Sequence, residues 1–159
     1  MQHYTVATVA LDHPDAVRLS DEVQAEYRKR FGHDDTTPLS PSYFAAPNGL
    51  FLVAYRDGAP VASGGWRAQD TTDDGYLGGD AEVKRMYVVP EARGRGLARR
   101  ILGALEESAR SAGRRRMVLE TGDVLPEAVR LYQSSGYLPT TGFGFYRDHP
   151  DSRFFQKPL

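Results

Sequence analysis

Cysteine is absent from this chain of 159 residues. Its absence excludes disulfides, thiolate metal sites and any mechanism that proceeds through a cysteine acyl-enzyme. The four histidines, His3, His13, His33 and His149, do not have the spacing of metal ligands. We therefore expect metal-free chemistry, and a chain without cysteine is typical of a cytoplasmic protein.

Long apolar runs and a large net charge are also lacking. No stretch approaches the roughly 20 apolar residues that a membrane-spanning helix needs, and the N-terminus lacks the pattern of a signal peptide. The net charge is −1, with 26% charged and 40% hydrophobic residues, which argues against a broad nucleic-acid-binding surface. We expect a single domain over residues 1–159, with neither nucleic acid nor membrane as a partner.

Hydrophobic periodicity predicts the element order β-α-β-β-β-α-β-α-β-β. The first helix is expected to begin at a cap, Asp12, and to end at Gly32, and the dipeptide Asp57-Gly58 predicts a hairpin turn. Trp66 is expected in the core, whereas Glu106 and the triplet at 114–116 are expected to face solvent. The predicted strands span residues 4–11, two strands within 50–68, 81–89, 114–121, 137–139 and 153–159, and the predicted helices span 12–32, 97–113 and 126–136.

A basic stretch with two glycines, "VVPEARGRGLARRIL" (88–102), begins the second helix. Its arginines are Arg93, Arg95, Arg99 and Arg100. A helix start already carries partial positive charge, so four added cations predict that something negative binds here. Because the rest of the chain is nearly neutral, that partner is expected to be small.

Gly94 and Gly96 allow consecutive backbone N–H groups to point into one concavity, which would suit a pyrophosphate. The alternative is an ordinary glycine turn with solvated arginines. A P-loop is excluded because Leu97 and Ala98 follow the last glycine, and a dinucleotide fingerprint is excluded because Arg99 stands where a third small residue is needed.

The pattern Arg-x-x-Gly-x-Ala, from Arg93 to Ala98, resembles the acyl-CoA pyrophosphate loop of the GNAT superfamily of N-acetyltransferases. A second segment, "EAVRLYQSSGY" from Glu127 to Tyr137, is similar to a later helix of that superfamily. The resemblance extends over essentially the whole chain. It implies an α/β fold with a mixed, mostly antiparallel sheet of about seven strands, helices on both faces, and a splay between strands 4 and 5 that admits acetyl-CoA.

The resemblance also implies cofactor contacts. Leu125 departs from the superfamily, which often has an asparagine there that contacts the cofactor. The implied contacts are the backbone of Met86, Tyr87 and Val88 for the pantetheine arm and the backbone of Arg93, Gly94, Arg95, Gly96, Leu97 and Ala98 for the pyrophosphate.

Acetyl transfer to an amine needs a base, an oxyanion donor and an acid for the departing thiolate. By resemblance, the Met86 N–H is the oxyanion donor and Tyr132 the acid, although Tyr132 could also be a core residue. Glu82, four residues before Met86, matches the superfamily's general base, but it could instead pair with Lys84 or face solvent. Glu120 on the next strand is the second candidate base.

The acceptor pocket is expected to be bordered by Asp34, Asp35 and the loop 140–148, whose Phe143, Phe145 and Tyr146 could stack on a substrate or pack internally. The predicted function is transfer of an acetyl group from acetyl-CoA to a primary amine of a small molecule or protein, by direct attack in a ternary complex. A non-catalytic acyl-CoA sensor of the same fold is the alternative. The sequence leaves the oligomeric state open, a homodimer included.

Overall fold

The computed structural model describes residues 3–122 and 125–159 of the chain. Its helices and strands follow the predicted order, and two connections contain short 3-10 helices. The elements are β1 (Tyr4–Thr8), α1 (Pro14–Phe31), η1 (Pro41–Phe44), β2 (Gly49–Arg56), β3 (Ala59–Gln69), β4 (Asp80–Val88), η2 (Pro90–Ala92), α2 (Leu97–Ser111), β5 (Arg116–Gly122), α3 (Pro126–Ser134), β6 (Leu138–Pro139) and β7 (Ser152–Pro158).

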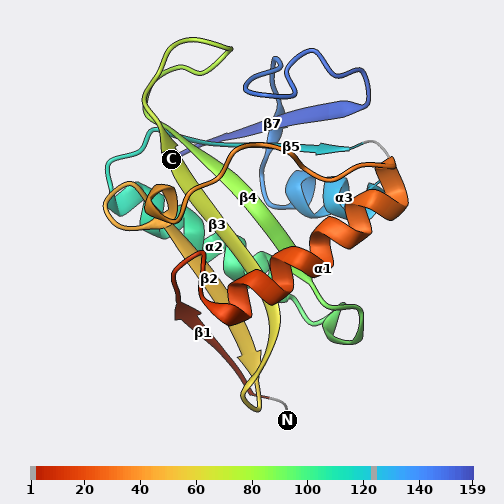
Figure 1. Cartoon of the computed structure of the whole chain (residues 1–159). Coiled ribbons are helices and arrows are strands. Elements are labelled where there is room, and N and C mark those ends of the chain that lie inside the picture. Colours follow the sequence, from red (N-terminus) through yellow and green to blue (C-terminus); the bar gives the residue numbers. More distant parts are fainter. Residues whose placement is uncertain (1–2, 123–124) are drawn as a thin grey trace.

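The strands form one mixed sheet in the order β1-β2-β3-β4-β5-β7-β6. The pair β4–β5 is parallel and the other neighbouring pairs are antiparallel. Helix α1 crosses one face of the sheet, and α2 and α3 lie on the other (Figure 1). This arrangement confirms the predicted fold class. No helix in the described ranges is long and apolar enough to cross a membrane.

Local signals set most element ends. Gly32 ends α1 with a φ of 82°, and the hairpin turn has positive φ at both Asp57 (51°) and Gly58 (80°), as a type I′ turn requires. The prediction that Asp12 caps this helix was wrong. Pro14 takes the first helical position, so His13 becomes the cap, and its Nδ1 accepts from the Asp15 N–H at 3.0 Å.

Two expectations about charged side chains were also wrong. Arg116 is buried, because the parallel register sets it opposite Asp80 and its guanidinium binds both carboxylate oxygens at 2.8 and 3.0 Å. Glu106 is buried as well, since it accepts from Tyr137 Oη and Lys157 Nζ, both at 2.9 Å. In each case a partner distant in sequence compensates for the lost hydration. Trp66 is in the core, as predicted.

The ends of β4 and β5 separate from each other. The two strands pair only from Asp80–Glu82 to Arg116–Val118, after which β4 continues beside β3 and β5 beside β7. A strand without a neighbour leaves backbone hydrogen-bonding groups available on that edge. The divergence is the predicted splay, and it opens the sheet where the candidate site residues lie.

Candidate active site

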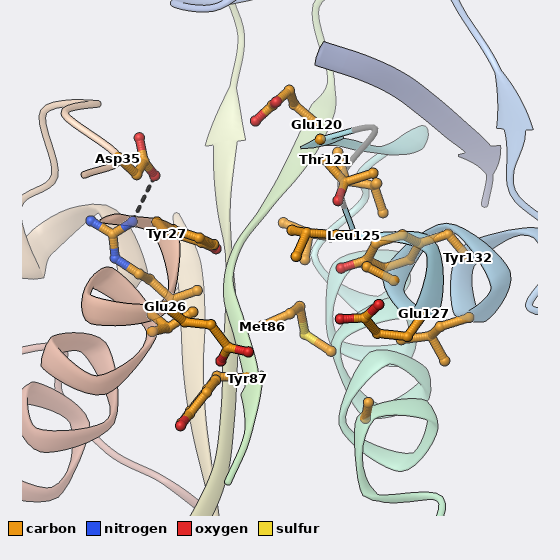
Figure 2. A pocket seen from close by; sticks show the side chains of 18 of the residues that line it. Glu26, Tyr27, Asp35, Met86, Tyr87, Glu120, Thr121, Leu125, Glu127 and Tyr132 are labelled. Atoms are coloured by element: carbon orange, nitrogen blue, oxygen red, sulfur yellow. Dashed lines mark hydrogen bonds and ion pairs between the residues drawn. The ribbon is translucent and has the colours of Figure 1, made fainter. Parts of the chain in front are cut away.

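A pocket of about 420 Å³ occupies the opening between β4 and β5. Its walls come from α1, the end of β4, the start of α2, the end of β5 and α3. Tyr27 of α1 and Tyr132 of α3 lie on opposite sides of it (Figure 2). The predicted cofactor residues that line the pocket are Met86, Tyr87, Val88, Arg93, Gly94, Gly96, Leu97 and Ala98. Arg95 is exposed and lies outside this lining.

A β-bulge shapes the β4 wall. Ser63 of β3 is opposite Tyr87 and Gly65 is opposite Lys84, so two β4 residues, Arg85 and Met86, share the single partner Gly64. Arg85 adopts a φ of 60°, which is uncommon for a side chain with a Cβ. The bulge re-aims side chains locally and interrupts the regular ladder at the point where Met86 enters the pocket wall.

Gly64 also makes room for Met86. A Cβ at position 64 would overlap the Met86 sulfur and press on Ile101 of α2. The Met86 side chain therefore lies on the α2 side of the sheet, and Met86 is part of the pocket wall. The backbone role expected for Met86 stays a prediction.

The glycine loop has the backbone geometry that its sequence predicted. Gly94 and Gly96 both adopt a φ of 77°, in the left-handed region that favours glycine. Gly96 is the N-cap of α2 and has no side chain to satisfy the first N–H groups of the helix. Those donors and the positive end of the helix dipole form a surface suited to an anion.

The arginines around this loop bind neighbouring segments. Arg93 Nε donates to the Val88 carbonyl at 2.9 Å, and its Nη2 lies 3.0 Å from Glu26 of α1. Arg99 donates to the hydroxyls of Ser134 and Ser135 at 2.8 and 3.0 Å. These contacts position the loop between α1 and α3.

Tyr132 lies in the pocket wall, with its ring packed on Tyr137 and Phe155. Burial raises its pKa, and the charge of nearby Glu120 adds to the effect. A phenol with a raised pKa stays protonated at neutral pH, so Tyr132 can donate a hydrogen bond into the pocket. Both readings of Tyr132, as core residue and as proton donor, are compatible with this position.

Glu82 lies outside the pocket lining and is only 4% exposed. Its carboxylate accepts from Arg67 Nε at 3.1 Å and from the Gln69 amide and Tyr76 hydroxyl at 3.0 Å each. Lys84 Nζ lies 3.8 Å away. With its oxygens engaged by these donors and no place in the lining, Glu82 is poorly placed to contact a ligand in the pocket.

Glu120 lies at the end of β5 in the pocket wall (Figure 2). Burial raises its pKa, and the charge of Asp35 acts in the same direction, whereas Ser152, Lys84 and His149 oppose the shift. A carboxyl group with a raised pKa binds a proton more readily than an exposed one. A position in the pocket together with this property makes Glu120 suited to proton transfer.

Asp35 joins the connection after α1 to the bulge of β4 (Figure 2). Its carboxylate accepts from Arg85 Nη1 at 2.6 Å and from the Tyr146 hydroxyl at 3.0 Å, and Lys84 Nζ lies 3.5 Å away. Burial acts to raise the pKa of Asp35, but Lys84, the hydrogen bonds from Thr37 and Arg85 together outweigh it and hold that pKa well below the usual range. Asp35 is thus a fixed anion beside the pocket.

The loop 140–148 contributes unevenly to the pocket. Tyr146 lines it, as do Asp34 and Asp35. Phe143 instead packs on Tyr76 and Phe154 beneath the loop, and Phe145 is 59% exposed.

Comparison with known sequences assigns the family. The sequence model of the "Acetyltransferase (GNAT) family" matches residues 17–137, which are most of the chain. The chain belongs to the GNAT family. As a GNAT protein it is an acyltransferase, and the family implies acyl-CoA as its cosubstrate.

Several GNAT relatives are similar over most of their length. An "IAA acetyltransferase" of Azospirillum brasilense is 35% identical over 100% of both chains, and the uncharacterized N-acetyltransferase YjgM of Escherichia coli is 30% identical over 79% of this chain and 76% of its own. A solved structure from Klebsiella pneumoniae, named as an acyl-CoA N-acyltransferase, has 28% identity and a TM-score of 0.81, covering 98% of this chain and 97% of its own.

The residues of this GNAT site fit acyl-CoA. At both Gly94 and Gly96, a Cβ would meet no atom of the described residues within 4 Å apart from the adjoining backbone, so the loop is open to a ligand. The first N–H groups of α2 would hold the pyrophosphate, and the free edge of β4 would hold the amide groups of the pantetheine arm. Leu125 lines the pocket without the side-chain amide that many GNAT members have there.

Three residues of this GNAT pocket were not predicted from the sequence. Tyr27, Lys84 and Arg85 were not assigned to the pocket, yet all three line it. The only signal for the two cations was their place inside an otherwise apolar strand, "AEVKRMYVV".

Proposed function

We propose that this protein transfers an acetyl group from acetyl-CoA to a primary amine by direct attack, with both substrates bound together. The observation that carries this proposal is one continuous pocket lined by the glycine loop, the splayed end of β4 and the carboxylate of Glu120. Acetyl-CoA supplies the acetyl group as a thioester. A shared pocket holds the amine close to it and removes much of the entropic barrier to a reaction between two molecules.

Glu120 is the base in this proposal, ahead of Glu82. Its carboxyl group faces the pocket and has a raised pKa because it is buried. Glu82 has three strong hydrogen-bond donors and lies behind the pocket wall. Glu120 would accept the proton that an ammonium group must lose before its nitrogen can attack.

The other two roles fall to Met86 and Tyr132. The N–H of Met86 lies at the bulge of β4 and would donate to the thioester oxygen as negative charge develops on it. Tyr132 would donate its proton to the departing sulfur: its raised pKa keeps the hydroxyl protonated until the sulfur leaves, and its position in the wall allows the contact. The 35% identity to a relative named as an acetyltransferase supports the reaction type.

The test is release of CoA thiol from acetyl-CoA in the presence of a panel of small amines and lysine-containing peptides. We expect release that depends on an amine, with the acetylated product identified by mass spectrometry. Tight binding of acetyl-CoA without release for any amine would favour the non-catalytic sensor instead.

A further inference from the structure

Three cationic side chains are buried together beside the pocket: Arg67, Lys84 and Arg85, whose side chains are 11, 9 and 8% exposed. Two carboxylates pair with them, those of Asp35 and Glu82. Among these five side chains there is one more positive than negative charge. The Glu120 carboxylate, whose charge acts on Lys84, offsets that surplus while it is deprotonated. Once Glu120 takes a proton, the buried surplus is left without a counter-charge, which is costly, so the cluster then favours a further anionic group.

The two carboxylates cannot neutralise the surplus by closer contact. One oxygen of Asp35 is shared by Arg85 at 2.6 Å and Lys84 at 3.5 Å, while the other accepts from Thr37 and from the Tyr146 hydroxyl. The Glu82 carboxylate is held by the donors described above. The excess positive charge thus lies on the two cations nearest the pocket, Lys84 and Arg85, which both line it.

The bulge of β4 is responsible for this placement. Neighbouring residues on a regular strand point to opposite faces, yet Lys84 and Arg85 both contact Asp35 on the α1 side of the sheet. The bulge permits this only with Arg85 at a φ of 60°, a conformation that is unfavourable for a non-glycine residue. The fold thus maintains a strained backbone that keeps the Arg85 guanidinium at the acceptor end of the pocket.

A simple amine or polyamine would bring further positive charge to this cluster. A zwitterion would bring an anionic group for the cations and an ammonium group for Glu120. Resting on the proposed function, we propose that the acceptor is a small zwitterion with an anionic group, most simply a carboxylate, besides its amine, and that Arg85 binds that group together with Lys84.

The charge balance of the reaction fits this acceptor. Transfer forms the N–C bond of the amide and breaks the C–S bond of the thioester. The nitrogen loses two protons. Glu120 accepts one and passes it to solvent. The other replaces the proton that Tyr132 gives to the sulfur. While Glu120 is protonated, it cannot balance the surplus positive charge of the cluster. The carboxylate of the acceptor can balance that charge, and it forms no covalent bond during the reaction.

Matched acceptors test the inference. Each amino acid is compared with the amine that lacks its carboxylate and with its methyl ester: tryptophan with tryptamine, lysine with cadaverine, and β-alanine with ethylamine. We expect kcat/KM for at least one zwitterion to exceed that of both its partners by about tenfold or more, the usual effect of one charged hydrogen bond. If the amines and esters that lack the carboxylate are turned over as fast or faster in every set, the zwitterion inference is overturned and acetyl transfer still stands. No CoA release with any acceptor would overturn both.

Variants of Arg85 assign the role. In Arg85→Met, kcat/KM for the preferred zwitterion should fall by about 10- to 100-fold, mainly through KM, while its methyl ester changes by less than about threefold. The kcat/KM of Arg85→Lys for the zwitterion should lie between those of the parent protein and Arg85→Met. Arg67→Met is the matched control, since Arg67 is equally buried in the cluster but lies outside the pocket lining. Because it removes one charge from the cluster at a distance from the pocket, it should lower the melting temperature and weaken the preference for the zwitterion less than Arg85→Met does.

Calorimetric binding of acetyl-CoA checks that each variant is folded. If Arg85→Met does not fold, the Arg85→Lys variant still tests the role of Arg85, and the comparison of acceptors with the parent protein still tests the zwitterion inference. A parental preference for the zwitterion in folded Arg85→Met would remove Arg85 from the acceptor site.

Discussion

Replacing Glu120 and Glu82 separately by glutamine should have opposite effects on stability, and only the change at Glu120 should remove the base. In Glu120→Gln, turnover should fall by about 10²- to 10⁴-fold, the usual contribution of a positioned general base. Because the amide keeps the shape of the side chain, affinity for acetyl-CoA should be unchanged. The expected loss arises from the position of Glu120 in the pocket and from its readiness to bind a proton.

The same substitution should stabilise the protein at neutral pH. Burial raises the pKa of Glu120 in the folded state above its value in the unfolded chain. The favourable contribution of the neutral form is therefore present below the ordinary carboxyl pKa of about 4.3 and is lost as the pH rises through the raised value. Glu120→Gln should accordingly melt higher than the parent at about pH 7, and the difference should disappear in acid.

Glu82→Gln should instead destabilise the protein. It removes a charge that is 4% exposed and that binds Arg67, Gln69 and Tyr76. Loss of one partner of a buried ion pair costs about 3–5 kcal/mol, and each kcal/mol lowers the melting temperature by about 2–4 °C in a chain of this size. The melting temperature should fall by roughly 6–20 °C.

The pH dependence of kcat/KM separates the two residues. A base must be deprotonated, so the rate of the parent should rise with pH through the raised pKa of Glu120. This acidic limb should be absent in Glu120→Gln and retained in Glu82→Gln, measured by thiol release at a temperature where both variants are folded. The opposite result, with the limb lost only in Glu82→Gln, would refute the assignment and restore the role to Glu82.

Three further variants probe the walls of the pocket. Tyr132→Phe should lower turnover by about 10²- to 10⁴-fold with little change in melting temperature, and a near-parental single-turnover rate would leave Tyr132 a packing residue. Gly96→Val should abolish calorimetric binding of acetyl-CoA with modest loss of stability, because the loop needs a φ of 77°, whereas Gly103→Ala on the exposed face of the same helix should bind normally. Gly122→Ala should lower the free energy of unfolding by about 1–3 kcal/mol, since its Cβ would overlap the Phe31 ring. In a double-mutant cycle, Phe31→Leu should recover part of that loss. Simple additivity of the two effects would contradict the clash.

The sequence by itself determined the order of the elements and the geometry of the glycine loop. Helix caps, hairpin turns and periodic apolar faces depend on residues a few positions apart, so they can be read locally. Gly94 and Gly96 are an example, since only glycine adopts a φ of 77° readily. The same two positions, with the helix that contains Tyr132, carried the resemblance to the GNAT family.

The tertiary structure decided which charged groups face the pocket. Glu82 and Glu120 were both reasonable bases from their strands, and only the pairing of Arg67 with Glu82 across β3 and β4 removed one of them from the pocket wall. The bulge at Arg85 depends on its register with Gly64, which lies 21 positions earlier in the chain. Such contacts join residues far apart in sequence, and a strand's own residues do not specify which partner it will meet.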